Sequence, residues 1–79
     1  MKENIIPLNC LPLGKKAVVK ELISDGAIRR RMLDLGLIAE TIIEALQRSP
    51  SGDPIAYDIR GAVIAIRSEE ASKILVEAI

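Results

Sequence analysis

Few residues of this chain could carry chemistry. The 79-residue sequence has no histidine and a single cysteine, Cys10. Without an imidazole, the chain can form neither a histidine-based catalytic triad nor a histidine metal site. A lone cysteine cannot form an internal disulfide or a CxxC motif, which fits a reducing compartment. Cys10 could be a reactive thiol, but we favour its interpretation as a small buried hydrophobic residue, and we expect no enzyme activity and no cofactor.

Carboxylates are the remaining candidate metal ligands, and they are spread along the chain: Asp25, Asp34, Asp53, Asp58 and the glutamates. They form no dense cluster in the sequence, so we interpret them as helix caps, turn formers and solvated strand residues. Asp53, for example, lies between Gly52 and Pro54, where an aspartate side chain commonly stabilises a turn. The glycines are isolated and do not form a phosphate-binding loop.

The run Arg29-Arg30-Arg31 allows two interpretations. It is either a solvated helix face with positive charge near the helix C-terminus, or part of a docking patch. In the second case Arg29 and Arg30 point outward, Arg31 borders the core and Leu33 supplies an apolar anchor. Leu33 could instead pack beneath the following turn. The candidate partner-binding residues are Arg29, Arg30, Arg31, Leu33, Asp34, Gly36 and Leu37, and a second candidate is the loop with Pro50, Gly52, Asp53 and Pro54.

Composition narrows the class of partner. The net charge is zero, and the chain has one tyrosine but no phenylalanine or tryptophan. Aromatic side chains are the usual platform for single-stranded nucleic acid and for proline-rich peptides, so we expect neither ligand. No segment has the roughly 20 apolar residues of a membrane span, and no signal peptide opens the chain. We therefore expect a cytoplasmic location without membrane insertion.

Three short strands, at residues 41–47, 55–59 and 62–66, are the centre of the predicted fold. The second strand alternates between Ile55, Tyr57 and Ile59 on one face and smaller or polar residues on the other. The first connection is rich in proline, glycine and serine. The second is the dipeptide Arg60-Gly61, in which glycine supplies the positive φ of a tight hairpin. These features predict an antiparallel meander.

The remaining elements must cover that meander, because a small meander cannot bury both faces. Residues 15–23 are expected to form a strand whose buried face the pattern does not decide. A helix over residues 27–35 has the stripe Ile28, Met32 and Leu35, an N-cap among residues 24–26 and Gly36 at its C-terminal end. A second short helix is expected to start at the cap Ser68, followed by a strand at 74–79. Residues 1–14 are expected to be irregular.

The predicted order is therefore β-α-β-β-β-α-β in one domain spanning residues 1–79. A mainly β chain of this size with five short strands and an aliphatic core indicates a small, partly open barrel of the SH3-like kind. We expect the meander to be the centre of stability, with Ile59 and Ile64 both buried.

Several motifs in this order resemble the FeoA proteins of bacterial ferrous iron transport. The resemblance covers nearly the whole chain, from Leu8 to Val76, and is carried by Leu13-Gly14, residues 28–37, residues 52–55, residues 59–61 and residues 64–71. One position departs from the family pattern, which often has Pro-Gly before the first meander strand where this chain has Ala39-Glu40. That difference affects the expected geometry of this turn but not the expected fold.

The resemblance implies an SH3-like barrel and a cytoplasmic accessory protein that is not an enzyme. FeoA-like proteins are thought to act on FeoB, a membrane transporter with a cytoplasmic GTP-binding domain, so the implied partner is a FeoB-type transporter. A similar barrel occurs at the C-terminus of DtxR-type repressors. The alternative is therefore a stand-alone regulatory module that binds a peptide or a regulator. The oligomeric state and the sign of any effect on transport stay open.

Overall fold

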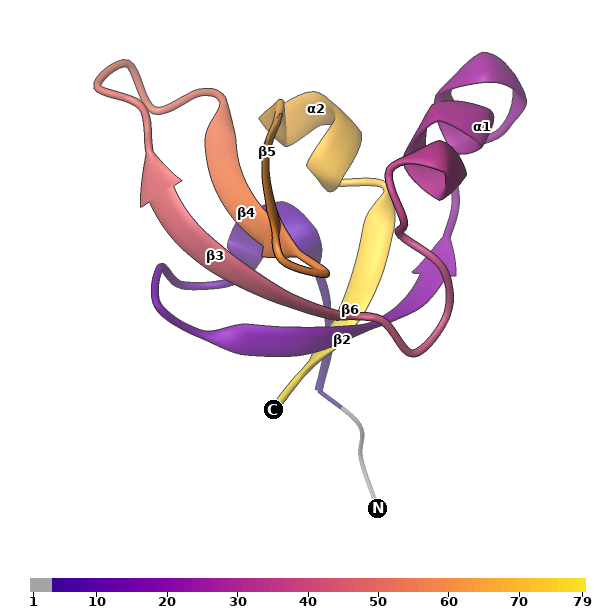
Figure 1. The fold of residues 1–79 in the computed structure, drawn as a ribbon, viewed down its shortest axis with the longest axis horizontal. Coiled ribbons are helices and arrows are strands. Elements are labelled where there is room, and N and C mark those ends of the chain that lie inside the picture. Colours follow the sequence, from indigo (N-terminus) through magenta and orange to yellow (C-terminus); the bar gives the residue numbers. More distant parts are fainter. Residues whose placement is uncertain (1–3) are drawn as a thin grey trace.

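The computed structural model describes residues 4–79 and shows one antiparallel sheet. The strand order is β1-β6-β2-β3-β4-β5, so that β1 and β5 are the sheet edges (Figure 1). The strands are β1 (Ile5–Pro7), β2 (Lys16–Leu22), β3 (Ile42–Arg48), β4 (Ile55–Ile59), β5 (Ala62–Ile66) and β6 (Ile74–Ala78). The helices are the 3-10 turn η1 (Leu8–Cys10), α1 (Gly26–Asp34) and α2 (Ser68–Ala71). The prediction of a mainly β fold with short helices is confirmed.

The meander β3–β4–β5 forms as the alternation predicts. Ile55, Tyr57 and Ile59 on β4 are all buried. Arg60 and Gly61 have φ values of 55° and 90°, as a two-residue hairpin turn requires, and the amide of Gly61 donates to the Asp58 carboxylate at 3.0 Å. The expectation for Ile64 is wrong in part, because this residue of the edge strand is only half-buried.

A β-bulge explains why the sequence could not decide the buried face of β2. Ala17 and Val19 point into the core, and the pairing with β6 then shifts between Val19 and Glu21. A bulge adds one residue to the strand, so each side chain after it lies on the opposite face of the sheet from the one that simple alternation predicts. Leu22 therefore also faces the core although it is three positions from Val19.

The N-terminal segment, expected to be extended and irregular over residues 1–14, is more regular than that from residue 4 onward, and residues 1–3 lie outside the described part of the chain. Residues Ile5–Pro7 form β1, which pairs with β6 through Ile5 and Glu77. Pro7 fits there because a proline is tolerated on an edge strand, where its missing N–H breaks no ladder. The expectation that Cys10 is buried is wrong, since Cys10 ends η1 and is exposed.

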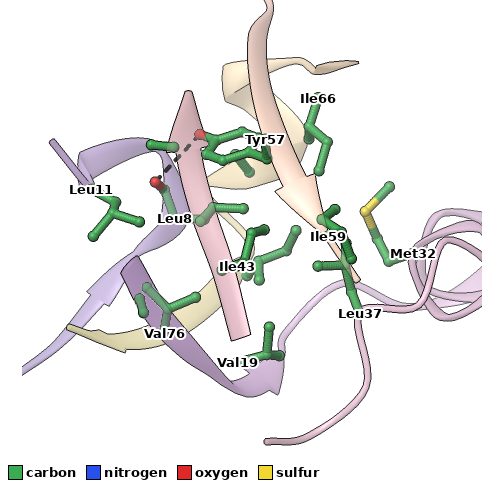
Figure 2. Close-up of a cluster of buried hydrophobic side chains, with 14 of the residues drawn as sticks. Leu8, Leu11, Val19, Met32, Leu37, Ile43, Tyr57, Ile59, Ile66 and Val76 are labelled. Atoms are coloured by element: carbon green, nitrogen blue, oxygen red, sulfur yellow. Dashed lines mark hydrogen bonds between the residues drawn. The ribbon is translucent and has the colours of Figure 1, made fainter. Parts of the chain in front are cut away.

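The core is almost entirely aliphatic and surrounds one aromatic ring (Figure 2). Tyr57 is fully buried, and its hydroxyl donates to the carbonyl oxygen of Leu8 at 3.4 Å. Burial raises the pKa of the Tyr57 hydroxyl to about 12. Leu8 and Leu11, from the segment before β2, complete this side of the core. No helix in the described part of the chain is both long enough and apolar enough to cross a membrane.

Candidate partner-docking surface

Helix α1 packs on the sheet through fewer residues than its sequence predicts. Met32 is fully buried and Leu35 is partly buried, but Ile28 is 46% exposed, so the expected three-residue core stripe is wrong at its first position. Asp25 is the N-cap residue through its backbone, and its side chain makes no capping hydrogen bond. A short helix held by one buried methionine leaves most of its surface free for other contacts.

The C-terminal end of α1 is a Schellman motif. Gly36 has φ of 96°, its amide donates to Leu33 O at 3.0 Å, and the amide of Leu37 donates to Met32 O at 3.1 Å. Leu37 and Met32 are both fully buried. Leu37 therefore belongs to the core, and its expected place on the docking surface is wrong.

The three arginines, expected as one patch, separate into three different environments. Arg29 donates through Nη1 to Leu22 O at 2.9 Å and so fastens α1 to the end of β2. Arg31 lies 2.6 Å from Glu70 and connects α1 to α2. Arg30 is exposed and makes no hydrogen bond or ion pair with any described residue. Of the three, Arg30 is the arginine whose guanidinium is engaged by no described residue.

Leu33 borders a hollow between α1 and β2. It is 39% exposed, and the hollow of about 260 Å³ is floored by core residues such as Val19, Leu22 and Leu37. Leu33 therefore remains at the surface rather than packing beneath the turn. A second, shallower hollow of about 500 Å³ continues from the first through Ile38 and Ala39.

Two exposed isoleucines that the sequence analysis missed extend this apolar strip. Ile38 is 45% exposed and Ile42 is 55% exposed, and both line the second hollow together with Arg60. The adjacent pair Ile42-Ile43 contained a signal, because two neighbouring residues of a strand face opposite sides and only one can enter the core. We call Arg30, Leu33, Ile38, Ile42 and Arg60 the α1–β3 surface.

Close packing fixes the two ends of the α1–β3 surface relative to each other. A β-carbon added to Gly36 would lie 3.2 Å from Cδ of Arg60 and 3.8 Å from Cγ2 of Ile59. The stem of Arg60 thus lies against the end of α1, and a β-carbon at position 36 would require this flexible side chain to move by a few tenths of an ångström. Asp34, the last residue of α1, is exposed next to this contact.

Ion pairs hold the adjoining part of the sheet. Lys20 contacts Glu77 at 3.3 Å and Glu40 at 3.4 Å. The hydrogen bond to Glu77, which has the larger effect, and the hydrogen bond to Glu40 both raise the pKa of Lys20. Glu40 has φ of 73°, so the position where the FeoA pattern often has glycine keeps a left-handed backbone here. The turn therefore forms with Ala39-Glu40 in place of Pro-Gly.

The second candidate loop lies away from the α1–β3 surface. Figure 1 shows the β3–β4 connection and α1 at opposite sides of the molecule. Asp53 in this loop accepts a hydrogen bond from the amide of Ser68 at 2.8 Å and lies 3.8 Å from Arg67. Ser68 is thus the first residue of α2 and not its side-chain cap, because Asp53 satisfies its free amide. Pro50 is exposed, whereas Gly52 and Pro54 are partly buried.

A third hollow, of about 420 Å³, lies between α1 and α2 and is lined by Ile23, Ser24, Asp25, Ile28, Glu69, Glu70 and Lys73. Its carboxylates do not form a metal site, since no three histidine, cysteine, aspartate or glutamate residues within residues 4–79 are grouped as ligands.

Comparison with known proteins gives the family. The model of the FeoA domain matches residues 6–78. The Fe(2+) transport protein A/Fe(2+) transporter FeoB fusion protein of Porphyromonas gingivalis is 35% identical over 72 residues, which are 91% of this chain and 8% of the fusion protein. The chain therefore spans less than a tenth of that relative's length.

Solved structures agree in sequence and in fold. The FeoA-like protein from Clostridium acetobutylicum has 34% identity and a TM-score of 0.89, covering 100% of this chain and 91% of its own. The zinc complex of Stenotrophomonas maltophilia FeoA, described as an SH3 domain protein, has 30% identity and a TM-score of 0.74, covering 87% and 86%. These matches confirm the SH3-like fold.

A manganese-dependent transcriptional repressor shares only the fold, with 19% identity and a TM-score of 0.87, and the match covers 100% of this chain and 44% of the repressor. IdeR of T. acidophilum likewise has 18% identity and a TM-score of 0.85, and the match covers 100% of this chain and 36% of IdeR. Since the family model spans nearly the whole chain, the result is unambiguous: the chain belongs to the FeoA family.

Proposed function

We propose that this chain is a non-enzymatic accessory protein of bacterial ferrous iron uptake that docks on the cytoplasmic side of a FeoB-type transporter and modulates it. The observation that carries the proposal is the fusion protein of Porphyromonas gingivalis, in which a segment similar to this chain is covalently joined to FeoB. Fusion keeps two modules at high effective concentration, which is useful when the modules must interact.

The α1–β3 surface is the proposed contact. It combines exposed apolar side chains at Leu33, Ile38 and Ile42 with a free positive charge at Arg30, one helical turn before Leu33. Apolar anchors supply buried area, and peripheral charge increases the rate of association. The surface is also well fixed, because Arg29 and Arg31 hold α1 to β2 and α2.

The experiment measures binding of a FeoB cytoplasmic domain to the parent chain and to matched variants by stopped-flow and surface plasmon resonance. Arg30→Glu is expected to slow association and to weaken its dependence on salt. Leu33→Ala and Ile38→Ala are expected to accelerate dissociation. Ile79→Ala is the control, because Ile79 is also an exposed aliphatic residue but directly follows β6, outside the α1–β3 surface.

The proposed surface is wrong if the three variants bind as the parent does while folding normally. The partner itself is wrong if the parent chain shows no saturable binding to FeoB with or without GTP. In the first case the loop with Pro50, Gly52, Asp53 and Pro54 is the next surface to test.

The alternative function is a stand-alone regulatory module for a peptide or a DNA-binding regulator. It is supported by the fold that this chain shares with the repressors, but at 18% identity that likeness concerns the fold alone. A pull-down separates the two functions. Recovery of a membrane GTPase favours transport, and recovery of a DNA-binding protein favours the alternative.

A further inference from the structure

Strand β5 is the open edge of the sheet, and nothing in its sequence protects it. Its only neighbour in the described sheet is β4. Natural edge strands are usually guarded by charged residues, proline or a bulge, because free backbone groups attract other strands. β5 consists of Ala62, Val63, Ile64, Ala65 and Ile66 and pairs with β4 in an unbroken register.

The register identifies the free backbone groups. Ile59 and Ala62 close the two-residue turn, so they form a hydrogen-bonded pair. Hydrogen-bonded and non-hydrogen-bonded pairs then alternate along an antiparallel ladder. Ala62, Ile64 and Ile66 therefore bond to β4, while the N–H and C=O groups of Val63 and Ala65 point away from it. No described residue forms a hydrogen bond with these outward groups.

Burial along β5 shows that this edge is open to solvent. Ile66 is buried, Ile64 is half-buried and Ala62 is exposed, although all three lie on the face directed to the core. On the other face Val63 is 69% exposed. An added strand would cover the exposed part of Ile64 and satisfy the groups of Val63 and Ala65 together.

The charges at the two ends of β5 decide which strand fits. Arg60 precedes β5 and Arg67 follows it, and the side chain of Arg67 is 69% exposed with only a 3.8 Å contact to Asp53. A second copy pairing symmetrically about Ile64 would place Arg60 of each copy beside Arg67 of the other. That arrangement opposes self-association, whereas acidic ends on a different strand would be attracted to both arginines.

We propose that the edge of β5 is a docking site for an extended segment of another protein that is apolar in its middle and acidic at both ends. Binding occurs by strand addition, with backbone hydrogen bonds to Val63 and Ala65 and with charge pairs at Arg60 and Arg67. This site adjoins the α1–β3 surface and shares Arg60 with it, but its backbone contacts lie on β5 and it does not depend on the identity of the transporter.

The test uses the isotope-labelled chain and two short synthetic peptides. Both peptides alternate valine and threonine in the middle, and one carries aspartates and the other lysines at its ends. We expect the acidic peptide to shift the amide signals of Val63 and Ala65 saturably, and to bind about ten-fold more tightly than the basic peptide at low salt. High salt should reduce this preference.

Variants make the result specific. Ala65→Pro removes only an outward N–H, so it should leave the fold intact and abolish peptide binding. Arg67→Glu should remove most of the preference for acidic ends, and it tests the site even if the proline variant is unstable. Arg30→Glu on α1 is the control and should bind the peptide as the parent does. This control separates the outcome from that of the transporter experiment.

The proposal is overturned if the peptides bind elsewhere, if neither peptide binds, or if a folded Ala65→Pro variant binds the acidic peptide normally. It is also overturned if the chain alone shifts the Val63 and Ala65 signals with increasing concentration, because a second copy would then be the occupant.

Discussion

The Nη1 atom of Arg31 lies 2.6 Å from Oε2 of Glu70, and this ion pair is a direct link between the two helices α1 and α2. The Glu70 side chain is only 22% exposed, and its other oxygen is buried without a hydrogen-bond partner among the described residues. Arg31 therefore compensates a largely buried carboxylate rather than extending a charged patch.

We predict that Arg31→Ala lowers the free energy of unfolding by about 1 kcal/mol, because Glu70 loses its charge partner. Arg30→Ala is the matched control on the same helix and should change stability by less than about 0.5 kcal/mol. Urea denaturation measures both. Equal losses in the two variants would show that the general charge of α1 matters rather than this pair.

A second prediction concerns the two isoleucines that flank the β4–β5 turn. Ile59 is fully buried, so Ile59→Ala should cost about 2–5 kcal/mol. Ile64 is half-buried on the edge strand, and Ile64→Ala should cost about half as much. Thermal and urea unfolding of both variants measure the difference. An equal loss would mean that the edge of β5 is covered in solution.

Gly61 tests the turn itself. Its φ of 90° is strained for any residue with a β-carbon, although no atom lies within 4 Å of the position that a β-carbon would occupy. Gly61→Val should therefore destabilise the chain by about 1–3 kcal/mol through backbone strain. Gly61→Asn should cost less, since asparagine tolerates the left-handed region. If both variants unfold like the parent, the hairpin does not have this turn in solution.

The sequence predicts a structural feature well when residues close together in the chain determine it, and poorly when distant segments do. The Arg60-Gly61 turn and the Gly36 helix end follow from glycine conformations, and the structure has both. Helix α1 and the strands of the meander also follow from short-range patterns. In contrast, β1 pairs with β6, which lies at the other end of the chain. Because β1 has only three residues and one of them is a proline, its sequence contains no recognisable strand pattern.

The candidate site was harder to predict for the same reason. Arg29 and Arg31 find their partners in Leu22 O and Glu70, and no local pattern shows such contacts. The exposure of Ile28 depends on how far α1 reaches over the sheet, which is a property of tertiary packing. The burial of Leu37, however, follows from the hydrophobic contact of a Schellman motif, once Gly36 is placed at the helix end.

The last prediction is a pH dependence that comes from Tyr57. Burial raises the pKa of its hydroxyl from 10.0 to about 12 in the folded chain. Between these values the unfolded state has lost a proton that the folded state keeps, so stability must fall as pH rises through this interval. Below pH 10 the Tyr57 hydroxyl is protonated in both states and costs no stability. By pH 12 its ionisation in the unfolded state lowers the free energy of unfolding by about 2–3 kcal/mol.

Tyr57→Phe isolates this contribution, because lysines and arginines titrate alike in both chains and cancel in the difference. At neutral pH the variant should be less stable by about 1 kcal/mol, since Leu8 O loses its hydrogen bond. As pH rises above 10 the gap should close and then reverse, which urea titrations at a series of pH values would measure. A constant difference across that range would mean that the Tyr57 hydroxyl ionises as easily in the folded chain as in the unfolded chain, and that the ring is therefore hydrated rather than enclosed by the core.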